Sequence, residues 1–493
     1  MKTAIVIGAG IGGIAAALRL SKKGYQVTIF EANDYPGGKL SAFSLGNYRF
    51  DAGPSLFTMP QYVTELFELH DEVSTNFFTY QKKKIACQYF WEDQTHITAY
   101  ADQKLFLEEI QNKLGVKSSI LKKYLKRAQR KFDLTAPLFL EQSLHKLKSF
   151  LTTKTLKALL HLNLYEINQN LHSVNARQLK EPHLVQMYDR YATYNGSSPY
   201  QTPGIMTLVQ HLEQEYGTFV PEGGMEQIAL SLFELAKRKG VTFHLGEKVE
   251  EILLEEKKAV GVKTQNQFLN ADIVLSNMDV FPTYKKLLKG VATPERILSQ
   301  ERSSSAVIFY WGIQKKFDQL DLHNIFFSED YKAEFDAIFN QKTPSDDFTV
   351  YVNLTYKDVP SDAPQGGENW FVMINTPADY GQDWGQIKRE LREKTIDKLN
   401  RILKVDLRPL IQEEAVLTPP LIQQKTSSHL GALYGSSSND KMAAFLRHPN
   451  FTTKIKNLYF CGGSVHPGGG IPLCLLSAKI ATDLIPVATN DSI

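Results

Sequence analysis

The sequence has few of the features that mark several common protein classes. Only three of its 493 residues are cysteines, and Cys87, Cys461 and Cys474 form neither a CxxC pair nor a cluster with histidine. A disulfide framework and a zinc site are therefore not expected, and no other metal site is predicted. The net charge is only +3, which provides no overall basic field for binding nucleic acid. No internal repeat of fixed period is found.

Long hydrophobic runs are also missing. No stretch of about 18 apolar residues occurs, so we expect no membrane-spanning helix. The first apolar run, residues 4–7, has neither a basic segment nor a cleavage site before it, so we expect no secretory signal. The low cysteine content fits a reducing cytoplasmic setting. With 43% hydrophobic and 22% charged residues the composition is globular, and the length predicts about two or three domains.

A cluster of glycines follows the first apolar run. Residues 4–7 (AIVI) form a predicted buried strand, and the pattern Gly8-x-Gly10-x-x-Gly13 comes directly after it. Gly8 permits a tight strand-to-helix turn, Gly10 lets the backbone approach a pyrophosphate, and Gly13 lets the next helix pack closely on the strand. Free N–H groups at the start of that helix would bind the phosphates.

The following strand completes this pattern. Residues 27–30 (VTIF) form a second predicted strand, and Glu31 ends it, about 20 residues after the glycines. At that position the carboxylate can accept a hydrogen bond from a ribose hydroxyl. A strand before the glycines, a helix after them and an acidic residue at this spacing together predict a dinucleotide-binding fold.

Two further glycine loops favour a flavin over a nicotinamide cofactor. The segment EANDYPGGKLSAF begins at Glu31, and the segment YRFDAGPSLF begins at Tyr48. The paired glycines expose backbone amides, the lysine beside them adds a cation, and a simple nicotinamide domain needs neither loop. Together these segments resemble the flavoprotein superfamily that contains amine oxidases, protoporphyrinogen oxidase and carotenoid desaturases.

The carboxy-terminal region strengthens this resemblance. The segment NLYFCGGSVHPGGGIPLCLL begins at Asn457 and predicts a strand over 458–461, a glycine turn and a helix from Ile471. It closely resembles the C-terminal signature of bacterial phytoene-desaturase-type carotenoid desaturases, in which this segment lies along the flavin and its phosphates. In a third segment, FVPEGGMEQIAL from Phe219, glycines again precede a helix. Further along, Val249 matches the family's adenine-side contact.

The resemblance implies an α/β fold and non-covalent FAD. We expect a discontinuous Rossmann-like FAD-binding domain (GR2-type flavoprotein) over 1–75, 216–285 and 441–493. An inserted mixed-sheet substrate domain would cover 76–112 and 286–440, and a helical cap that faces a membrane would cover 113–215. The predicted FAD-binding residues are Gly8, Gly10, Ile11, Gly12, Gly13, Glu31, Ala32, Gly38, Lys39, Leu40, Gly53, Pro54, Ser55, Val249, Gly462, Gly463, Gly470 and Ile471.

The cap region has an unusual charge balance. Residues 113–157 contain twelve lysines and arginines but only two acidic residues, and apolar residues follow helical spacing over 120–128. Such a pattern fits either a solvated basic face packed on a core, which is the commoner case, or a helix at a membrane surface. A carotenoid must be withdrawn from a membrane, so the resemblance favours the second interpretation. We therefore expect a cytoplasmic protein that associates peripherally with the inner membrane.

The substrate side of the chain is less specific. Strand-like runs over 303–417 and an amphipathic helix over 386–403 predict an antiparallel sheet with helical cover. Phe309, Tyr310 and Trp311 fit either a tunnel lining or plain core. Residues 190–204 place tyrosines among glycine, serine and asparagine, which is typical of a lining or lid, or of an ordinary structural loop. The tyrosines predicted to line the substrate site are Tyr191, Tyr194 and Tyr200.

The 190–204 segment resembles the hydroxycarotenoid and methoxycarotenoid 3,4-desaturases more than phytoene desaturases. The predicted function is therefore FAD-dependent C-3,4 desaturation of a 1-hydroxylated acyclic carotenoid end, as in a hydroxy-γ-carotene-like substrate. A phytoene desaturase and a carotene isomerase are alternatives, and so is a non-enzymatic prenyl-chain-binding protein of GDP-dissociation-inhibitor type. An amine oxidase is less favoured because no covalent-flavin cysteine motif is found. No catalytic side chain is assigned, and the oligomeric state and electron acceptor stay open.

Overall fold

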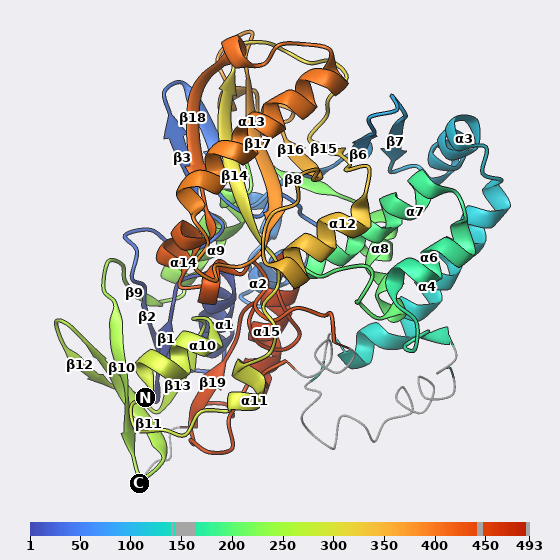
Figure 1. Ribbon diagram of the computed structural model, residues 1–493. Helices are drawn as coiled ribbons and strands as arrows, with labels where there is room; N and C mark the ends of the chain where they lie inside the picture. Colours follow the sequence, from blue (N-terminus) through green and yellow to red (C-terminus); the bar gives the residue numbers. More distant parts are fainter. Residues whose placement is uncertain (140–141, 143–160, 162–163, 441–446, 490–493) are drawn as a thin grey trace.

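The computed structural model describes residues 1–139, 142, 161, 164–440 and 447–489. Figure 1 shows one sheet near the two chain ends, a larger sheet at the opposite end, and a group of helices to one side of both. No helix among the described residues is long and apolar enough to cross a membrane.

The first sheet has five parallel strands in the order β19-β13-β1-β2-β9. Its central strand is the predicted apolar run, and residues 4–7 are buried on both faces, as expected for a strand covered on two sides. The strands come from three distant stretches of the chain: β1 (Thr3–Ile7), β2 (Gln26–Phe30), β9 (Thr242–His244), β13 (Ile273–Ser276) and β19 (Leu458–Phe460).

Helices and a small sheet cover the two faces of this first sheet. One face packs against α1 (Ile11–Lys22), α2 (Gln61–Glu68), α9 (Glu226–Arg238) and α15 (Ile471–Asp483) in a single apolar core. The other face packs against an antiparallel meander of β10 (Val249–Glu255), β11 (Lys258–Thr264) and β12 (Phe268–Asn270). This three-layer arrangement is that of a doubly covered α/β domain.

The larger sheet has seven strands in the order β18-β14-β17-β16-β15-β6-β7. All its neighbours pair antiparallel except β15 and β6, which are parallel, so the sheet is mixed as the resemblance implied. Its strands are β6 (Ile85–Phe90), β7 (His96–Tyr100), β14 (Ser305–Ile313), β15 (His323–Phe326), β16 (Val350–Asn353), β17 (Glu368–Thr376) and β18 (Ile411–Leu417).

A long helix covers the outer face of this sheet. The predicted helix over 386–403 is α13 (Trp384–Leu403), and it starts two residues early because the Asp383 side chain accepts a hydrogen bond from the Gln386 N–H and caps it. Leu391, Ile396 and Leu399 of α13 pack on the sheet, in a core that includes Trp370. The inner face of the sheet is thus left to the rest of the molecule.

The cap is helical over its described residues. Its elements are α3 (Gln103–Leu114), α4 (Ser118–Phe139), α6 (Leu171–Leu179), α7 (Pro182–Asp189), η4 (Arg190–Asn195), η5 (Gly204–Leu208), α8 (Val209–His211) and η6 (Leu212–Tyr216). The apolar stripe of α4 is buried in the cap core, and its cations Lys122, Lys123 and Lys126 are exposed. Over its described residues α4 therefore packs its apolar side on the core and exposes its basic side. The basic stretch 143–160 lies outside the described residues.

Short elements join these three parts. The small strands are β3 (Ala42–Leu45), β4 (Tyr48–Asp51), β5 (Tyr80–Lys82) and β8 (Phe219–Pro221). The short helices and turns are η1 (Ser74–Asn76), α10 (Val280–Pro282), η7 (Thr283–Leu287), α11 (Glu295–Leu298), α12 (Tyr331–Asp336), η8 (Ala337–Gln341), η9 (Thr355–Lys357), η10 (Pro360–Asp362), η11 (Arg408–Leu410), α14 (Pro419–Thr426) and η12 (His429–Gly431).

Candidate cofactor and substrate site

One continuous cavity lies where the two sheets and the cap meet. Its volume is about 930 Å³, and it runs from the carboxyl ends of β1, β2 and β13 to the inner face of the seven-stranded sheet and the cap. This volume is near the upper end of the range for ligand pockets, about 300–1,000 Å³. Ligands of open parallel sheets bind at this end of the strands.

The glycine turn after β1 forms one wall of the cavity. α1 begins at Ile11 with Gly10 as its N-cap, and no side chain caps it and no acidic residue lies in its first turn. A Cβ at Gly13 would lie 2.0 Å from the Gly8 carbonyl oxygen, so only glycine allows the helix to pack this closely on the turn. Gly13 does not itself line the cavity, in keeping with a packing role.

Asn277, which the sequence reasoning missed, lies at the centre of this wall. It follows β13, and its N–H donates to the Ile7 carbonyl at 2.8 Å. A Cβ at Gly10 would lie 2.9 Å from its Nδ2, and a Cβ at Gly12 or at Gly462 would lie 2.7 Å from its Oδ1. The glycines thus make room for this amide as well as for a ligand. Its place after a parallel strand adjacent to β1 is the signal that could have identified it.

Glu31 directly follows β2 and lines the cavity. One carboxylate oxygen accepts the Ala9 N–H at 2.7 Å, and the other accepts the Asn33 N–H at 2.9 Å. These contacts fix the carboxylate beside the glycine turn. Oε1 also accepts from the Asn33 side-chain amide at 2.9 Å, but Oε2 has a second lone pair, so Glu31 can still accept a hydrogen bond from a hydroxyl group in the cavity.

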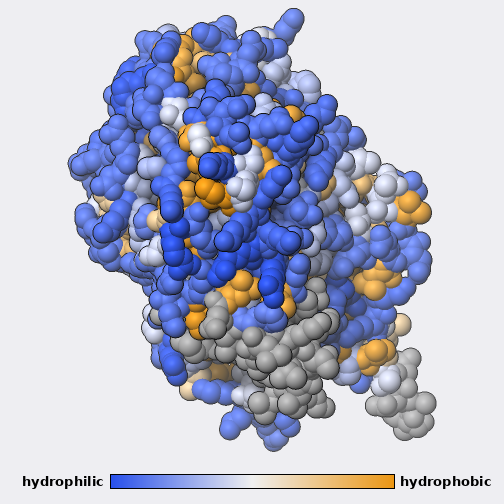
Figure 2. All heavy atoms as spheres, turned by 90° about the vertical axis from the view of Figure 1, so that its right-hand side faces the viewer, coloured by the Kyte–Doolittle hydropathy of each residue, from blue (hydrophilic) through white to orange (hydrophobic). Residues whose placement is uncertain are grey.

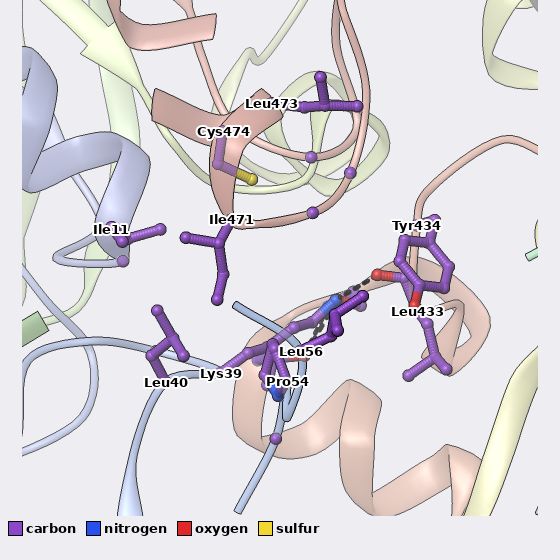
Figure 3. Close-up of a pocket in the computed structure, with 18 of the residues that line it drawn as sticks. Ile11, Lys39, Leu40, Pro54, Leu56, Leu433, Tyr434, Ile471, Leu473 and Cys474 are labelled. Atoms are coloured by element: carbon purple, nitrogen blue, oxygen red, sulfur yellow. Dashed lines mark hydrogen bonds between the residues drawn. The ribbon is translucent and has the colours of Figure 1, made fainter. Parts of the chain in front are cut away.

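Two cations in the cavity wall have no carboxylate partner within salt-bridge distance among the residues that the structure describes. The Lys39 ammonium donates to the Leu433 carbonyl at 2.9 Å, as the dashed line in Figure 3 shows. Arg447 donates from Nη1 to the Tyr434 carbonyl at 2.8 Å. Burial lowers the pKa of Lys39, an effect that Asp279 opposes, and burial together with the nearby Arg302 lowers the pKa of Arg447 to about 10. Both positions favour an anionic ligand.

A second helix start faces the same space. Gly470 has a φ of +112° and is the N-cap of α15, so glycine is strongly favoured there, and no side chain caps this helix. Figure 3 shows Ile11, Leu40 and Ile471 facing one open space. Two uncapped helix N-termini therefore meet in one cavity, an arrangement suited to phosphate groups.

Most residues predicted to hold FAD line this cavity. They are Gly8, Gly10, Ile11, Gly12, Glu31, Ala32, Gly38, Lys39, Leu40, Gly53, Pro54, Ser55, Val249, Gly462, Gly463, Gly470 and Ile471. We call residues 8–13, 37–39 and 462–470 the cofactor cradle. Its glycine backbones, two helix starts and buried cations fit the pyrophosphate of a dinucleotide, and the apolar side chains beside them fit a flat ring system.

The seven-stranded sheet lines the cavity with one face. Side chains alternate along a strand, so Ile308 and Tyr310 of β14 line the cavity, whereas Phe309 and Trp311 are buried under α13. The tunnel interpretation therefore holds for Tyr310, and the core interpretation holds for the other two. The lining residues from this sheet form what we call the cavity face: Cys87, Ile308, Tyr310, His323, Ile325, Thr349, Tyr351, Phe371, Met373, Asn375, Ala415, Val416 and Leu417.

The cap contributes a buried polar cluster. Arg190 donates to both Glu213 oxygens at 2.8 and 3.1 Å, and to the Tyr194 hydroxyl at 2.9 Å. Tyr194 and Tyr191 in turn donate to Glu213. Burial alone would raise the pKa of Glu213, but Arg190 and the tyrosine hydroxyls outweigh it and hold the pKa below its usual value. The carboxylate is thus ionised and paired.

Of the three tyrosines predicted to line a substrate site, Tyr194 lines the cavity. Tyr191 and Tyr200 are not among the described lining residues. Tyr191 is 2% exposed and lies in the cap core, and Tyr200 packs on its edge. η4 is helical, so only part of its circumference, with Tyr194, faces the cavity, whereas Tyr200 lies beyond η4.

Comparison with known proteins places the chain in a family. Residues 11–486 match the model of the flavin containing amine oxidoreductases. The chain belongs to this family. It is 56% identical to the 1-hydroxycarotenoid 3,4-desaturase of Flavobacterium sp. (strain P99-3), over 99% of each chain. It is 33% identical to the 4,4'-diaponeurosporene oxygenase of Staphylococcus aureus (strain MSSA476), over 98% of each chain.

A solved structure has the same fold. A putrescine oxidase variant aligns over 98% of both chains with a TM-score of 0.63, although only 12% of residues are identical. This amine oxidoreductase-family protein is therefore an FAD-dependent oxidoreductase with the α/β flavoprotein fold, as the sequence predicted. A carrier without redox function, the alternative of another class, is not favoured.

Proposed function

We propose that this flavoprotein is a carotenoid desaturase that introduces the C-3,4 double bond next to a 1-hydroxylated acyclic end, as in a hydroxy-γ-carotene-like substrate. The observation that carries this proposal is the 56% identity to a 1-hydroxycarotenoid 3,4-desaturase across 99% of both chains. The cavity is compatible with it, because one continuous space joins the cofactor cradle to the apolar side chains of the cavity face and the cap.

Desaturation removes a hydride and a proton from adjacent carbons. Bound FAD supplies the two-electron acceptor for such a step. The described residues supply positioning: Phe132 and Ala136 of α4 and Met206 and Leu208 of η5 line the cavity opposite the sheet. An apolar chain held between these layers would be oriented and shielded from water. No more is expected of the protein, because the polyene itself delocalises the positive charge left by hydride loss.

We also propose that the FAD-binding domain comprises 1–75, 216–285 and 441–493. The substrate domain would comprise 76–112 and 286–440, and the cap 113–215. The division is supported by the strands: those of the first sheet come from the first set of segments, and those of the larger sheet come from the second. The predicted FAD-binding residues that line the cavity would hold FAD. Tyr194 would contact the substrate, and Tyr191 and Tyr200 would pack behind Tyr194.

Substrate uptake would occur at a membrane surface, through peripheral contact with the inner membrane. Where its residues are described, the cap side in Figure 2 is mainly hydrophilic with separate hydrophobic groups, which supports contact through charge. Lys122, Lys123 and Lys126 are exposed there. Vesicle flotation should show binding to anionic vesicles that weakens in salt and in Lys122→Glu/Lys126→Glu. The control Lys315→Glu/Lys316→Glu should float as wild type, and absence of flotation at low salt would contradict the idea.

The function is tested by expression in cells that accumulate different carotenoids. Cells making a 1-hydroxylated acyclic carotenoid should yield a pigment with one more conjugated double bond, and cells making phytoene should show no change. Conversion of phytoene, or an oxygenated product instead of a longer polyene, would overturn the assignment. The assignment would also be overturned if the hydroxylated pigment stayed unchanged in these cells although the protein purified from them contained flavin.

A further inference from the structure

One polar side chain of the cavity face has an unusual environment. His323 on β15 lines the cavity and is 4% exposed, and its Nε2 is buried and has no hydrogen-bond partner among the described residues. Burial lowers the pKa of His323 to about 4, so the ring is neutral near pH 7. Buried polar atoms are normally paired, so an unpaired one beside a ligand cavity points to a partner supplied by the ligand.

The neighbours of His323 determine where its proton lies. The Asn353 amide Nδ2 is 3.3 Å from Nδ1, and an amide nitrogen can only donate, so Nδ1 must act as the acceptor. The Tyr351 hydroxyl lies 2.7 Å from the same Nδ1 and donates to its single lone pair, which the longer Asn353 contact shares. The neutral ring therefore carries its proton on Nε2. A fixed, buried N–H donor is thus available beside the cavity.

Two hydrogen bonds connect this donor to a loop that is predicted to hold FAD. His323 and Tyr351 lie on the same face of adjacent strands, and Tyr351 also shares a 2.8 Å hydrogen bond with Ser55. Ser55 follows Gly53 and Pro54 in the loop predicted to hold FAD, and it lines the cavity. The chain Ser55–Tyr351–His323 therefore links the cofactor loop to the donor.

The other polar groups nearby are already paired. Arg190 uses its nitrogens for Tyr89, Tyr194 and Glu213, and Glu213 accepts from Arg190 and two tyrosines. These groups hold the cap together but leave no buried atom unpaired. Among the described cavity-lining residues, the fully buried polar atom without a partner belongs to His323.

We infer that His323 Nε2–H donates a hydrogen bond to the tertiary hydroxyl of the substrate and so selects a 1-hydroxylated end. This inference rests on the proposed function. The hydroxyl carbon C1 is two bonds from C3, so the group that binds the hydroxyl must lie beside the reacting bond. The Ser55–Tyr351–His323 chain places the donor in the same cavity and connects it to the loop predicted to hold FAD. His323 is thus a specificity-determining residue, and the side chains of Tyr351 and Asn353 position it.

The test compares a 1-hydroxylated carotenoid with the same carotenoid lacking the hydroxyl. Purified FAD-loaded wild type, His323→Phe and Tyr351→Phe are assayed for kcat/KM with each, and for Kd from the shift in carotenoid absorbance. His323→Phe should lower the preference for the hydroxylated chain about tenfold, with most of the change in Kd, because one hydrogen bond is lost. Tyr351→Phe should lower it less, because Asn353 still holds the ring.

His96 provides the matched control. It lies on β7 of the same sheet but does not line the cavity, and its Nε2 is bonded to Gln88 at 2.8 Å. His96→Phe should leave the preference unchanged, and His323→Gln, which restores a donor, should recover part of it. If His323→Phe binds flavin normally and keeps the wild-type preference in Kd, the inference is wrong. If it fails to bind flavin, an unchanged preference in Tyr351→Phe, which keeps the His323 ring but removes the hydroxyl that donates to its Nδ1, overturns the inference.

The two proposals fail in different ways. If the wild type binds hydroxylated chains more tightly and His323→Phe removes that difference, but no chain is desaturated, the subsite stands and the proposed reaction fails. If the wild type desaturates the hydroxylated chain and His323→Phe keeps the same preference, the reaction stands and the subsite fails.

Discussion

The cofactor cradle and the cavity face line the same space but are built by opposite means. The cradle depends on missing side chains: its glycines let α1, α15 and the Asn277 amide approach one another closely. The cavity face depends on side chains that alternate along the strands of a mixed sheet, such as Tyr310 toward the cavity and Phe309 away from it. A substitution that adds a side chain to a cradle glycine should therefore disrupt cofactor binding. A substitution that replaces one side chain of the cavity face by another should instead change substrate binding.

The largest effect on flavin binding is expected where the cradle is tightest. Gly13→Ala places a Cβ 2.0 Å from the Gly8 carbonyl oxygen, so α1 must move away from β1. We expect loss of bound flavin and a free energy of unfolding lower by about 3 kcal/mol, measured by flavin content and chemical denaturation.

Gly385→Ala is the matched control for this change. Gly385 lies in the first turn of α13, where the nearest atom to a new Cβ is the Asp383 Oδ1 at 3.1 Å. Alanine should be tolerated or should stabilise by up to about 1 kcal/mol. A Gly13→Ala protein with full flavin content would show that close packing is not what the cradle requires.

The two faces of β14 provide the next comparison. Phe309 is 2% exposed beneath α13, so Phe309→Ala should lower the free energy of unfolding by about 3–5 kcal/mol. Tyr310 donates to the Ala52 carbonyl at 2.6 Å from the cavity side, so Tyr310→Phe should cost only about 1 kcal/mol but should alter KM. Denaturation and steady-state kinetics check both. A larger change in KM for Phe309→Ala than for Tyr310→Phe would contradict the assignment of the faces.

Lys39 tests charge in the cradle rather than space. Lys39→Met keeps the length of a buried side chain but removes the ammonium that donates to Leu433. FAD titration of the deflavinated protein should show a Kd higher by about 10–100-fold, since hydrogen bonds to charged groups are the stronger ones. The melting temperature without FAD should not fall, because the cation has no carboxylate within salt-bridge distance among the described residues. Unchanged FAD affinity would mean that Lys39 serves the fold alone.

The same contrast explains how much could be predicted from the sequence. Several features of the site are local patterns, because residues close together in the chain form each of them. They are the glycine turn at Gly8, Gly10 and Gly13, the acidic residue Glu31, and the start of α15 at Ile471. Their positions in the cavity could therefore be predicted before the fold was known, apart from Gly13, which acts through packing.

Residues whose role depends on long-range pairing could not be predicted. His323 becomes informative only when β15 pairs with β16 and brings it to Tyr351. Asn277 becomes informative only when β13 lies beside β1. The choice between Tyr310 and Phe309 required the position of α13, because alternation shows that the two differ but not which of them faces a ligand.

The most direct test mixes the purified flavoprotein with a 1-hydroxylated acyclic carotenoid in the absence of oxygen and records the absorbance of both chromophores. If the carotenoid lies in the cavity against the cofactor held by the cradle, the flavin bands should bleach while the carotenoid bands move to longer wavelength, in equal molar amounts. Flavin that stays oxidised while the carotenoid is bound, or a carotenoid that changes without bleaching, would contradict direct desaturation at this site.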